Sequence, residues 1–537
     1  MDLEENNNEI LPSKEEKTND NILTEDDTLN PKYTKGNTDF WGAFIQIGNT
    51  ILGAGIISLP VVIRYLGFIL GIIFIIIIAL LTIYSSYLLL KAHQITRKKK
   101  YSSIAHIALG GKGYIFTNIM IILNNFGLSC VYFRIFGDTI QNIIGGYVSK
   151  DNYLVTNWHN FLYILIILVL MCFVIWTEDF EKFQKTSFLG MIGIIVYFIT
   201  LLILFFYKIS KGFKPLYSSK SYFIDGEYTN ILISLPSVFL SFSFQFNLFP
   251  IYSGLIQRTH HEMLKSTEFS ILFCLILYIF SGICGFLMYG DSLNDTILLA
   301  FLNDMQDENT DQLMKILLII SNIGFVTCST TSIPLVYYAL KQTFFSTYKF
   351  VVKKNVQKGK NIEMTTVDKK ENENENENEN LDINNINRIN EPDENDNSNE
   401  ETTENNKNTN NDDNDNDNDI GRMDSIASID SSIDETVKKI KVSVSKTEEI
   451  IISIFLYITI GGVTILVPKL KSLFNIVGCT AANAIQFIIP SLIIVCLGSK
   501  AEKLVNLLCA KLLLIFGIIS LVICFTAEIL HLFTNDP

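Results

Sequence analysis

The sequence lacks the residue clusters on which most enzymes depend. Its nine cysteines and six histidines do not have the spacing of metal ligands, and the sequence has no glycine-rich phosphate-binding loop. No pair of residues can be recognised as a catalytic nucleophile and its base. Only 18% of the residues are charged, and the formal net charge of −13 does not favour nucleic-acid binding. We therefore expect neither an enzyme nor a cofactor, and no nucleic-acid partner.

No secretory signal is evident either. The first 39 residues are polar and acidic, without the basic start and short apolar core of a cleaved signal. The first long apolar segment is therefore expected to act as its own insertion signal. All nine cysteines fall in or beside apolar segments, so they resemble small hydrophobic residues and no disulfide is predicted.

Long apolar runs dominate the rest of the chain. Hydrophobic residues make up 49% of the sequence. Windows of about 20 residues identify segments long enough to cross a bilayer as helices. They predict an all-α membrane protein with about 11 transmembrane helices, at residues 41–66, 68–92, 114–144, 158–177, 187–207, 229–252, 267–289, 312–343, 448–467, 477–497 and 504–532.

Two acidic segments fall outside these runs. The second contains the tracts ENENENENEN and NDDNDNDND, which cannot bury apolar surface. We predict a disordered cytosolic N-terminal tail (1–39) and a disordered, Asn-rich cytosolic loop (346–446), which separates helices 1–8 (40–345) from helices 9–11 (447–537). Lysine and arginine are more frequent in loops on the side of the N-terminus, which favours a cytosolic N-terminus. Both the plasma membrane and a vacuolar or lysosomal membrane fit this pattern.

The first apolar segment contains an interruption. Its sequence, NTILGAGIISLP, begins as a membrane helix and then places Gly53, Ala54 and Gly55 just ahead of Ser58 and Pro60. A helix that unwinds within hydrocarbon frees backbone N–H and C=O groups, which is tolerated only where they line a polar cavity or bind something. Such half-helix ends suit a small zwitterion and an ion. Alternatively, the glycines only allow neighbouring helices to pack closely.

A second interrupted segment covers residues 229–255. Pro236 and Pro250 flank more hydrogen-bonding side chains than a lipid-facing helix needs, namely Ser237, Ser241, Ser243, Gln245 and Asn247. Some of the serines can bond to the backbone of their own helix instead. The first and sixth segments each open a set of five, as an inverted repeat requires. We therefore expect a five-plus-five inverted repeat in which helices 1 and 6 are discontinuous.

Four motifs in order resemble the amino acid/auxin permease family. They are Asn49 with GAGIISLP (53–60), YSSIA (101–105) with Gly110 and Gly113, FSF (242–244) with PIY (250–252), and VP (467–468) with Phe474, Gly478 and PSL (490–492). The resemblance covers about 40–345 and 447–532, and the nearest branch resembles the sodium-coupled neutral amino acid transporters. Gln245 departs from the pattern, because many relatives carry His there.

This resemblance implies a substrate site between helices 1, 3, 6 and 8. The carboxylate of an amino acid would meet N–H groups near Gly53 to Gly55, and its ammonium would meet carbonyls near Phe242 to Phe244. The candidate substrate residues are Asn49, Gly53, Ala54, Gly55, Ser241, Phe242, Ser243, Phe244, Gln245 and Asn247. The candidate residues for a coupling ion, Na⁺ or H⁺, are Asn49, Thr330, Thr331 and Ser332.

The charged residues favour sodium over protons. Arg134 and Asp138 lie four residues apart on one helix face, so they are expected to neutralise each other. No histidine lies near a predicted midplane, although a proton-driven carrier usually needs a titratable group in its path.

We therefore expect a monomeric, cation-coupled transporter of neutral amino acids in a lipid bilayer, working by alternating access. Three alternatives stay open. They are a proton-coupled vacuolar or lysosomal carrier, a non-transporting amino acid sensor with the acidic loop as its signalling arm, and a carrier for another solute.

Overall fold

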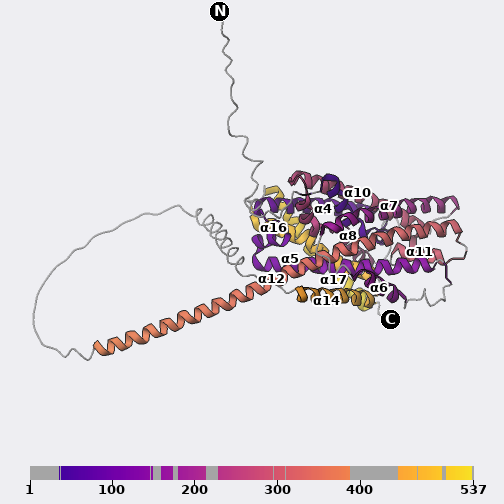
Figure 1. Cartoon of the computed structure of the whole chain (residues 1–537). Coiled ribbons are helices and arrows are strands. Elements are labelled where there is room, and N and C mark those ends of the chain that lie inside the picture. Colours follow the sequence, from indigo (N-terminus) through magenta and orange to yellow (C-terminus); the bar gives the residue numbers. More distant parts are fainter. Residues whose placement is uncertain are drawn as a thin grey trace, which may run out of the picture. The chain divides into compact units, whose positions relative to one another are not determined.

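The structure is a computed structural model that describes most of the chain (Figure 1). The described residues are 36, 38–145, 147–148, 159–172, 180–212, 228–293, 296–308, 310–386, 446–467, 470–498 and 504–534. Within these ranges the elements are helical, apart from an isolated bridge between Thr38 and Leu255. The chain divides into two units, residues 1–340 with 456–537 and residues 341–455. The candidate site lies wholly in the first unit.

The helices follow the order that the apolar segments predict. Those before residue 212 are α2 (Phe40–Gly55), α3 (Leu59–Leu66), α4 (Phe68–Thr96), α5 (Tyr101–Gly145), α6 (His159–Leu170) and α7 (Phe180–Ser210). Those that follow are α8 (Tyr228–Ser241), α9 (Gln245–Gly254), α10 (His260–Tyr289), η3 (Gly290–Ser292), α11 (Ile297–Gln306), α12 (Gln312–Ile386), α14 (Lys446–Leu466), α15 (Leu470–Val477), η4 (Gly478–Ala482), η5 (Ala484–Ile488), α16 (Ile489–Leu497) and α17 (Leu504–Thr534).

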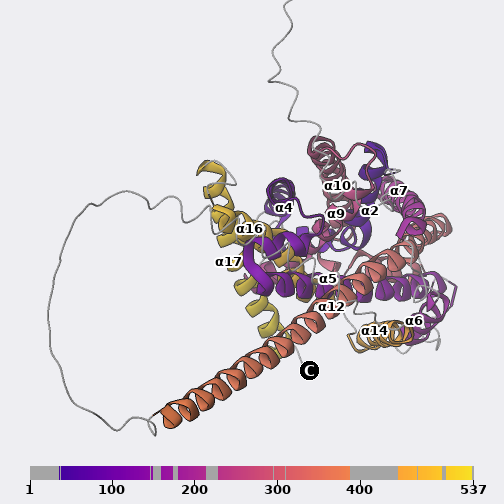
Figure 2. The ribbon, with the colours of Figure 1, turned by 60° about the vertical axis from the view of Figure 1, so that its left-hand side comes forward.

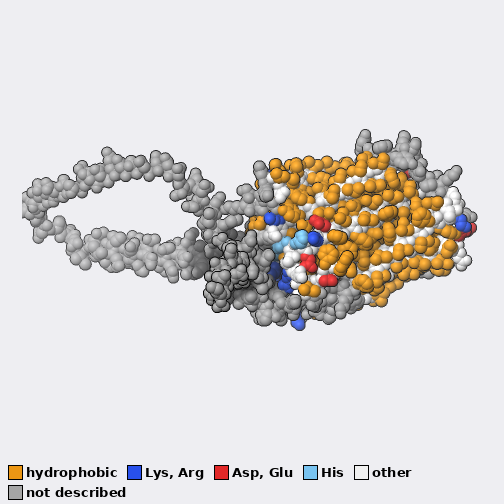
Figure 3. Space-filling view, turned by 90° about the horizontal axis from the view of Figure 1, so that it is seen from above, with side chains coloured by type: hydrophobic (Ala, Val, Ile, Leu, Met, Phe, Trp, Pro, Cys, Tyr) orange, Lys and Arg blue, Asp and Glu red, His pale blue; other side chains and the backbone are white. Residues whose placement is uncertain are grey.

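Nine helical stretches in the described part of the chain are long and apolar enough to cross a membrane. The first predicted segment, 41–66, is divided between α2 and α3, and the segment 158–177 is described as α6 and a short turn. Large apolar side chains face outward along these helices, as Ile73, Ile77 and Leu80 do on α4. Figure 3 shows a broad, almost uninterrupted apolar face, with the histidine and most of the visible charged side chains near one end and a few charged side chains at the other end. A surface of this kind suits the hydrocarbon core of a bilayer.

The first helix breaks at Ile56–Ser58, slightly later than the sequence predicted. Gly53 and Gly55 are still helical in α2, so placing the break at these glycines was wrong. The physical reason is Pro60, which has no N–H to donate and clashes with the carbonyl four residues earlier, at Ile56. The Ser58 hydroxyl and its backbone N–H both donate to the Gly55 carbonyl, at 2.9 and 3.1 Å, and they close the turn.

The sixth helix breaks at Phe242–Phe244, which confirms the predicted interruption. Phe244 leaves the helical region, with φ −137° and ψ −4°, and α9 starts at the next residue. The Gln245 side-chain oxygen accepts a hydrogen bond from the Phe244 N–H at 3.1 Å, so this backbone donor, which the break frees, has a partner. Pro236 and Pro250 both lie inside helices, in α8 and α9, rather than at the break itself.

Two further features were not predicted by the apolar periodicity. The segment 477–497 contains the π-helical stretches η4 and η5 before α16 begins. Helix α12 continues as far as Ile386, into the predicted disordered loop 346–446. Its side chains after Val352 and all of residues 387–445 lie outside the described set, so the disorder of that loop stays a prediction.

Candidate functional site

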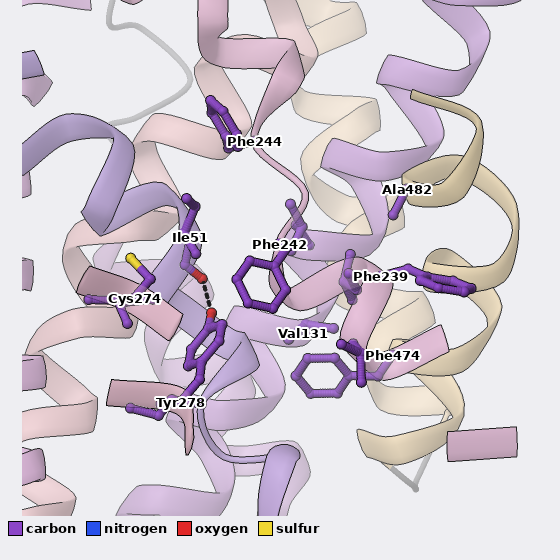
Figure 4. Packing of buried hydrophobic residues seen from close by; sticks show 14 of the residues in the cluster. Ile51, Val131, Phe239, Phe242, Phe244, Cys274, Tyr278, Phe474 and Ala482 are labelled. Atoms are coloured by element: carbon purple, nitrogen blue, oxygen red, sulfur yellow. Dashed lines mark hydrogen bonds between the residues drawn. The ribbon is translucent and has the colours of Figure 1, made fainter. Parts of the chain in front are cut away.

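The two helix breaks face each other and are joined by a tyrosine from α10. The single hydroxyl proton of Tyr278 is shared between the Ser241 carbonyl, at 2.9 Å, and the Ile51 carbonyl in α2. Figure 4 shows the contact with Ile51. Helix α10 runs alongside α2, which brings Tyr278 to this position (Figure 2). A Cβ on Gly55 would lie 2.5 Å from Ser241 and 2.7 Å from the Tyr278 hydroxyl. Gly55 is therefore required by close packing at the site itself.

A second tyrosine approaches the first broken helix from α5. A Cβ on Gly53 would lie 1.8 Å from the hydroxyl oxygen of Tyr132, so this position also has room only for hydrogen. The Phe242 ring packs edge-on against Tyr278, with ring centroids 5.1 Å apart. Phe242, Phe244, Tyr132 and Tyr278 are all buried and provide an aromatic surround for the breaks. The side chain of Ala54 lies outside the described set.

Several polar atoms at the breaks are buried without a partner in the described part of the chain. They are the Ser243 hydroxyl and the Gln245 side-chain nitrogen, both next to the Phe242–Phe244 break. Each unsatisfied buried group costs about 1–3 kcal/mol. Asn247, by contrast, donates to the Thr50 hydroxyl at 3.5 Å, and Ser241 donates to the Ser237 carbonyl of its own helix at 2.7 Å. Of the side chains predicted for the second break, Ser243 and Gln245 are therefore the ones with a buried polar atom left for a bound solute or water.

Asn49 and Thr331 meet at a third point, where α2, α7 and α12 converge. A Cβ on Gly190 of α7 would lie 2.7 Å from the Asn49 side-chain oxygen and 2.6 Å from the Thr331 hydroxyl oxygen. Asn49 is only 2% exposed, and its side-chain oxygen has no hydrogen-bond partner among the described residues. Two oxygens thus point at one small space, which a side chain at residue 190 would fill.

The other two candidate ion residues are placed differently. Thr330 and Ser332 flank Thr331 on α12, where neighbouring residues project about 100° apart. The Ser332 hydroxyl lies 4.0 Å from the Cys328 sulfur of its own helix. The structure therefore brings Asn49 together with Thr331. Thr330 and Ser332 project from α12 on either side of Thr331.

Hydrogen bonds to backbone carbonyl groups connect the broken helices to neighbouring segments of the chain. On one side, the Ile297 N–H at the start of α11 donates to the Ile57 carbonyl at 3.3 Å, and Arg64 donates to the Leu293 carbonyl. On the other side, the Thr38 N–H donates to the Gly254 carbonyl at the end of α9, at 3.0 Å. These hydrogen bonds connect the two broken helices to the segments that precede α2 and α11.

The ion pair expected on α5 is confirmed. Arg134 Nε lies 3.0 Å from a carboxylate oxygen of Asp138, and both side chains are largely buried. The Asp138 carboxylate is therefore paired with a positive charge on its own helix.

Sequence reasoning missed three residues of the site, Tyr132, Tyr278 and Gln486. The Gln486 amide, in η5, donates to the Thr82 hydroxyl and to the Phe242 carbonyl, at 2.5 and 3.4 Å. Nothing in the local sequence marks these residues, because they reach the breaks from other helices.

A comparison with family models decides the relationship. A model described as "Transmembrane amino acid transporter protein" matches residues 36–533. The chain belongs to this family. The resemblance to the amino acid/auxin permeases is thereby confirmed, and so is the expectation that this multi-pass membrane protein is not an enzyme.

Curated relatives in the amino acid transporter family are distant in sequence. Amino acid transporter AVT6E of Arabidopsis thaliana is 25% identical over 321 residues, covering 58% of this chain and 64% of that protein. Sodium-coupled neutral amino acid transporter 7 of Danio rerio is 20% identical over 317 residues, covering 57% of this chain and 64% of that protein. The matched part thus spans less than two thirds of these relatives.

A solved structure shares the fold of this family member. MhsT in complex with L-phenylalanine superposes with a TM-score of 0.54, covering 92% of this chain and all of that chain at 10% identity. At this identity the similarity shows the fold alone. Together with the two discontinuous helices, it confirms the expected all-helical membrane architecture.

Proposed function

We propose that this protein is a secondary active transporter that moves neutral amino acids by alternating access, driven by Na⁺. The observation that carries the proposal is the junction of the two broken helices at Tyr278, which surrounds freed backbone groups with buried aromatic rings. Discontinuous helices of this kind hold small zwitterions and ions in secondary transporters.

The substrate would bind with its charged ends on the backbone. Its carboxylate would approach N–H groups where α3 begins, beyond the Ile56–Ser58 break, because the positive end of a helix favours an anion. Its ammonium would approach the carbonyls of Phe242–Phe244 and the partnerless Ser243 hydroxyl. The side chain would then face Phe242, Phe244 and Tyr132, whose rings favour an uncharged group.

The coupling ion would bind where Asn49 and Thr331 meet. Na⁺ prefers several oxygen ligands, and these two side-chain oxygens could be joined by backbone carbonyls from the end of α2. Occupation of this space would tie α2 to α12 and so favour one arrangement of the first broken helix. A relative whose name includes sodium coupling supports the choice of ion.

The orientation and membrane are proposals as well. We propose a cytosolic N-terminus and either a plasma membrane or a vacuolar or lysosomal membrane, as the lysine and arginine distribution favours. We also propose that the protein acts as a monomer, because the site is built from one chain.

The test is uptake of labelled neutral amino acids into proteoliposomes with an imposed inward gradient of Na⁺ or of H⁺. We expect accumulation with Na⁺, and competition by neutral but not by acidic or basic amino acids. Accumulation with H⁺ alone would refute sodium coupling. Binding of amino acid without uptake under either gradient would refute transport and favour a sensor.

A further inference from the structure

A buried acid in the last helix lies outside the site described so far. Glu528 of α17 is 1% exposed. The Asn475 side-chain nitrogen, in α15, donates to a Glu528 carboxyl oxygen at 3.0 Å. The Asn475 side-chain oxygen in turn accepts from the Ser237 hydroxyl of α8, also at 3.0 Å. Three helices are thus joined through one amide to one carboxyl group.

This hydrogen-bond chain continues to both helix breaks. The Ser241 hydroxyl, at the last residue of α8, donates to the Ser237 carbonyl at 2.7 Å. The Tyr278 hydroxyl then contacts both the Ser241 carbonyl and the Ile51 carbonyl of α2, and Figure 4 shows the second of these contacts. A change at Glu528 can therefore reach α8 just before its break and, through Tyr278, the end of α2.

The contact between α8 and the α15–η4 segment is close. A Cβ on Gly478 would lie 2.1 Å from the Pro236 carbonyl oxygen, so the two backbones touch next to Ser237 and Asn475. Helix α17 also packs on α8, η4, η5 and α16. A small shift of Asn475 is therefore passed to α8 rather than absorbed by soft side chains.

The titratable groups near Glu528 determine whether a pH effect can be assigned to this carboxyl. Cys479 of η4 and Cys524 of α17 are the described thiols that interact electrostatically with it. Lys471 of α15, four residues before Asn475 and so on the same helix face, has a side chain outside the described set. The described side chains of α8, α15, η5 and α16 include no Asp, Glu, Lys, Arg or His. Lys511 lies seventeen residues away on α17, roughly 25 Å along the helix. His531, three residues beyond Glu528, has a side chain outside the described set.

We propose that Glu528 is a proton-binding site that controls the mobility of α8 during transport. The carboxylate takes one proton from the solution on the side where α17 ends and becomes a carboxylic acid, and the reverse step returns the proton. As a carboxylate it holds Asn475 by a charge-assisted hydrogen bond, which is about twice as strong as the neutral bond that remains after protonation. Proton binding therefore loosens the connection to Ser237 and allows α8 to move.

This inference rests on the proposed function, because its main readout is the rate of transport. Under a fixed Na⁺ gradient, we expect the maximal uptake rate to rise about fivefold as a lower external pH protonates Glu528, with little change in the KM for amino acid. Glu528→Gln should keep the fast rate at every pH, because the amide is neutral and still accepts from Asn475. Glu308→Gln, at an exposed acid between α11 and α12, should keep the wild-type pH profile.

Two more variants separate the hydrogen-bond chain from the acid. Ser237→Ala should reduce the pH effect while Glu528 still titrates. Ser234→Ala should not reduce it, because Ser234 donates only to the Ile231 carbonyl of its own helix, at 2.8 Å. If Glu528→Gln fails to reach the membrane, Glu528→Asp replaces it. The shorter acid cannot keep the 3.0 Å contact, so the expected result is a weakened pH effect.

Four results would overturn the proposal. They are a wild-type rate that does not vary with pH, a Glu528→Gln profile like that of the wild type, an unchanged Glu528→Asp profile, and loss of the pH effect in His531→Gln but not in Glu528→Gln. Absence of uptake by the wild-type protein would instead refute the proposed function. In that case, the thermal unfolding midpoint in detergent still tests the proton site, since wild-type and Glu528→Gln midpoints must diverge with pH, and coincident curves would overturn it.

Discussion

Gly55→Ala is the smallest change that tests the junction of the two broken helices. The added methyl carbon would lie 2.5 Å from the Ser241 Cβ, whereas carbon atoms in contact stay about 3.5–4.0 Å apart. Ser241 cannot simply turn aside, because its hydroxyl is bonded to Ser237 and its carbonyl to Tyr278. One of the helices must therefore shift by about 1 Å.

Overpacking of this kind costs about 1–3 kcal/mol. If the arrangement that carries substrate bears this cost, its population falls roughly five- to 150-fold, because about 1.4 kcal/mol corresponds to a factor of ten. The folded membrane protein should still form, since the other helices are untouched. We expect uptake to fall by that factor while the amount of protein in the membrane stays near the wild-type level.

The assay compares initial rates of labelled amino acid uptake, normalised to protein in the membrane. The matched control is Gly462→Ala in α14, where an added Cβ would meet nothing within 4 Å. That variant should transport like the wild type and gain slightly in helix stability. Wild-type uptake by Gly55→Ala would refute the reasoning that the junction is both tight and functional.

Three further outcomes follow from described contacts. Thr331→Val should raise the Na⁺ concentration needed for half-maximal uptake by about tenfold or more, because it removes one oxygen ligand. Thr327→Val, one turn earlier on the same helix, should leave that concentration unchanged, and equal effects of the two variants would contradict the assigned ion site. Tyr278→Phe should remove the one hydroxyl proton that two backbone carbonyls share, a contact worth about 1 kcal/mol, and so lower the thermal midpoint as well as uptake. An unchanged midpoint would contradict that structural role. On the surface, a hydrogen bond between Lys211 and Asp311 lowers the pKa of the Asp311 carboxyl and raises the pKa of the Lys211 amine, so the contribution of the pair is confined to pH values between about 4 and about 10. Because at least half of each side chain is exposed to solvent, this contribution is small: Asp311→Asn should leave uptake at the wild-type level and lower the thermal midpoint at pH 7 only slightly, and a large loss of either would contradict this.

Much of the fold could be predicted because bilayer-spanning segments and helix breakers are local features of sequence. The segment 229–255 revealed its break through clustered polar residues, and Pro60 revealed the break in the first helix. The exact position of the first break was wrong because a helix tolerates glycine, despite its low helix propensity, where a neighbour leaves no room for a side chain. Gly53 and Gly55 meet such neighbours in Tyr132, Ser241 and Tyr278, so close packing and interruption both occur in this helix.

The residues that complete the site could not be predicted from local sequence. Tyr278 lies 37 residues after Ser241 and 227 after Ile51, and Gln486 lies 244 after Phe242. Such contacts depend on how the helices are arranged in space. The link from Glu528 through Asn475 to Ser237 is of the same kind, because Asn475 lies 238 residues after Ser237.

The most direct measurement of the central claim is concentrative accumulation. Proteoliposomes containing the full chain are given a labelled neutral amino acid and an inward Na⁺ gradient, and the internal concentration is followed before and after an ionophore collapses the gradient. We predict that the internal concentration rises above the external one, and that the excess is lost when the gradient is dissipated. An internal concentration that never exceeds the external one, with or without Na⁺, would contradict sodium-driven transport through the junction of the broken helices.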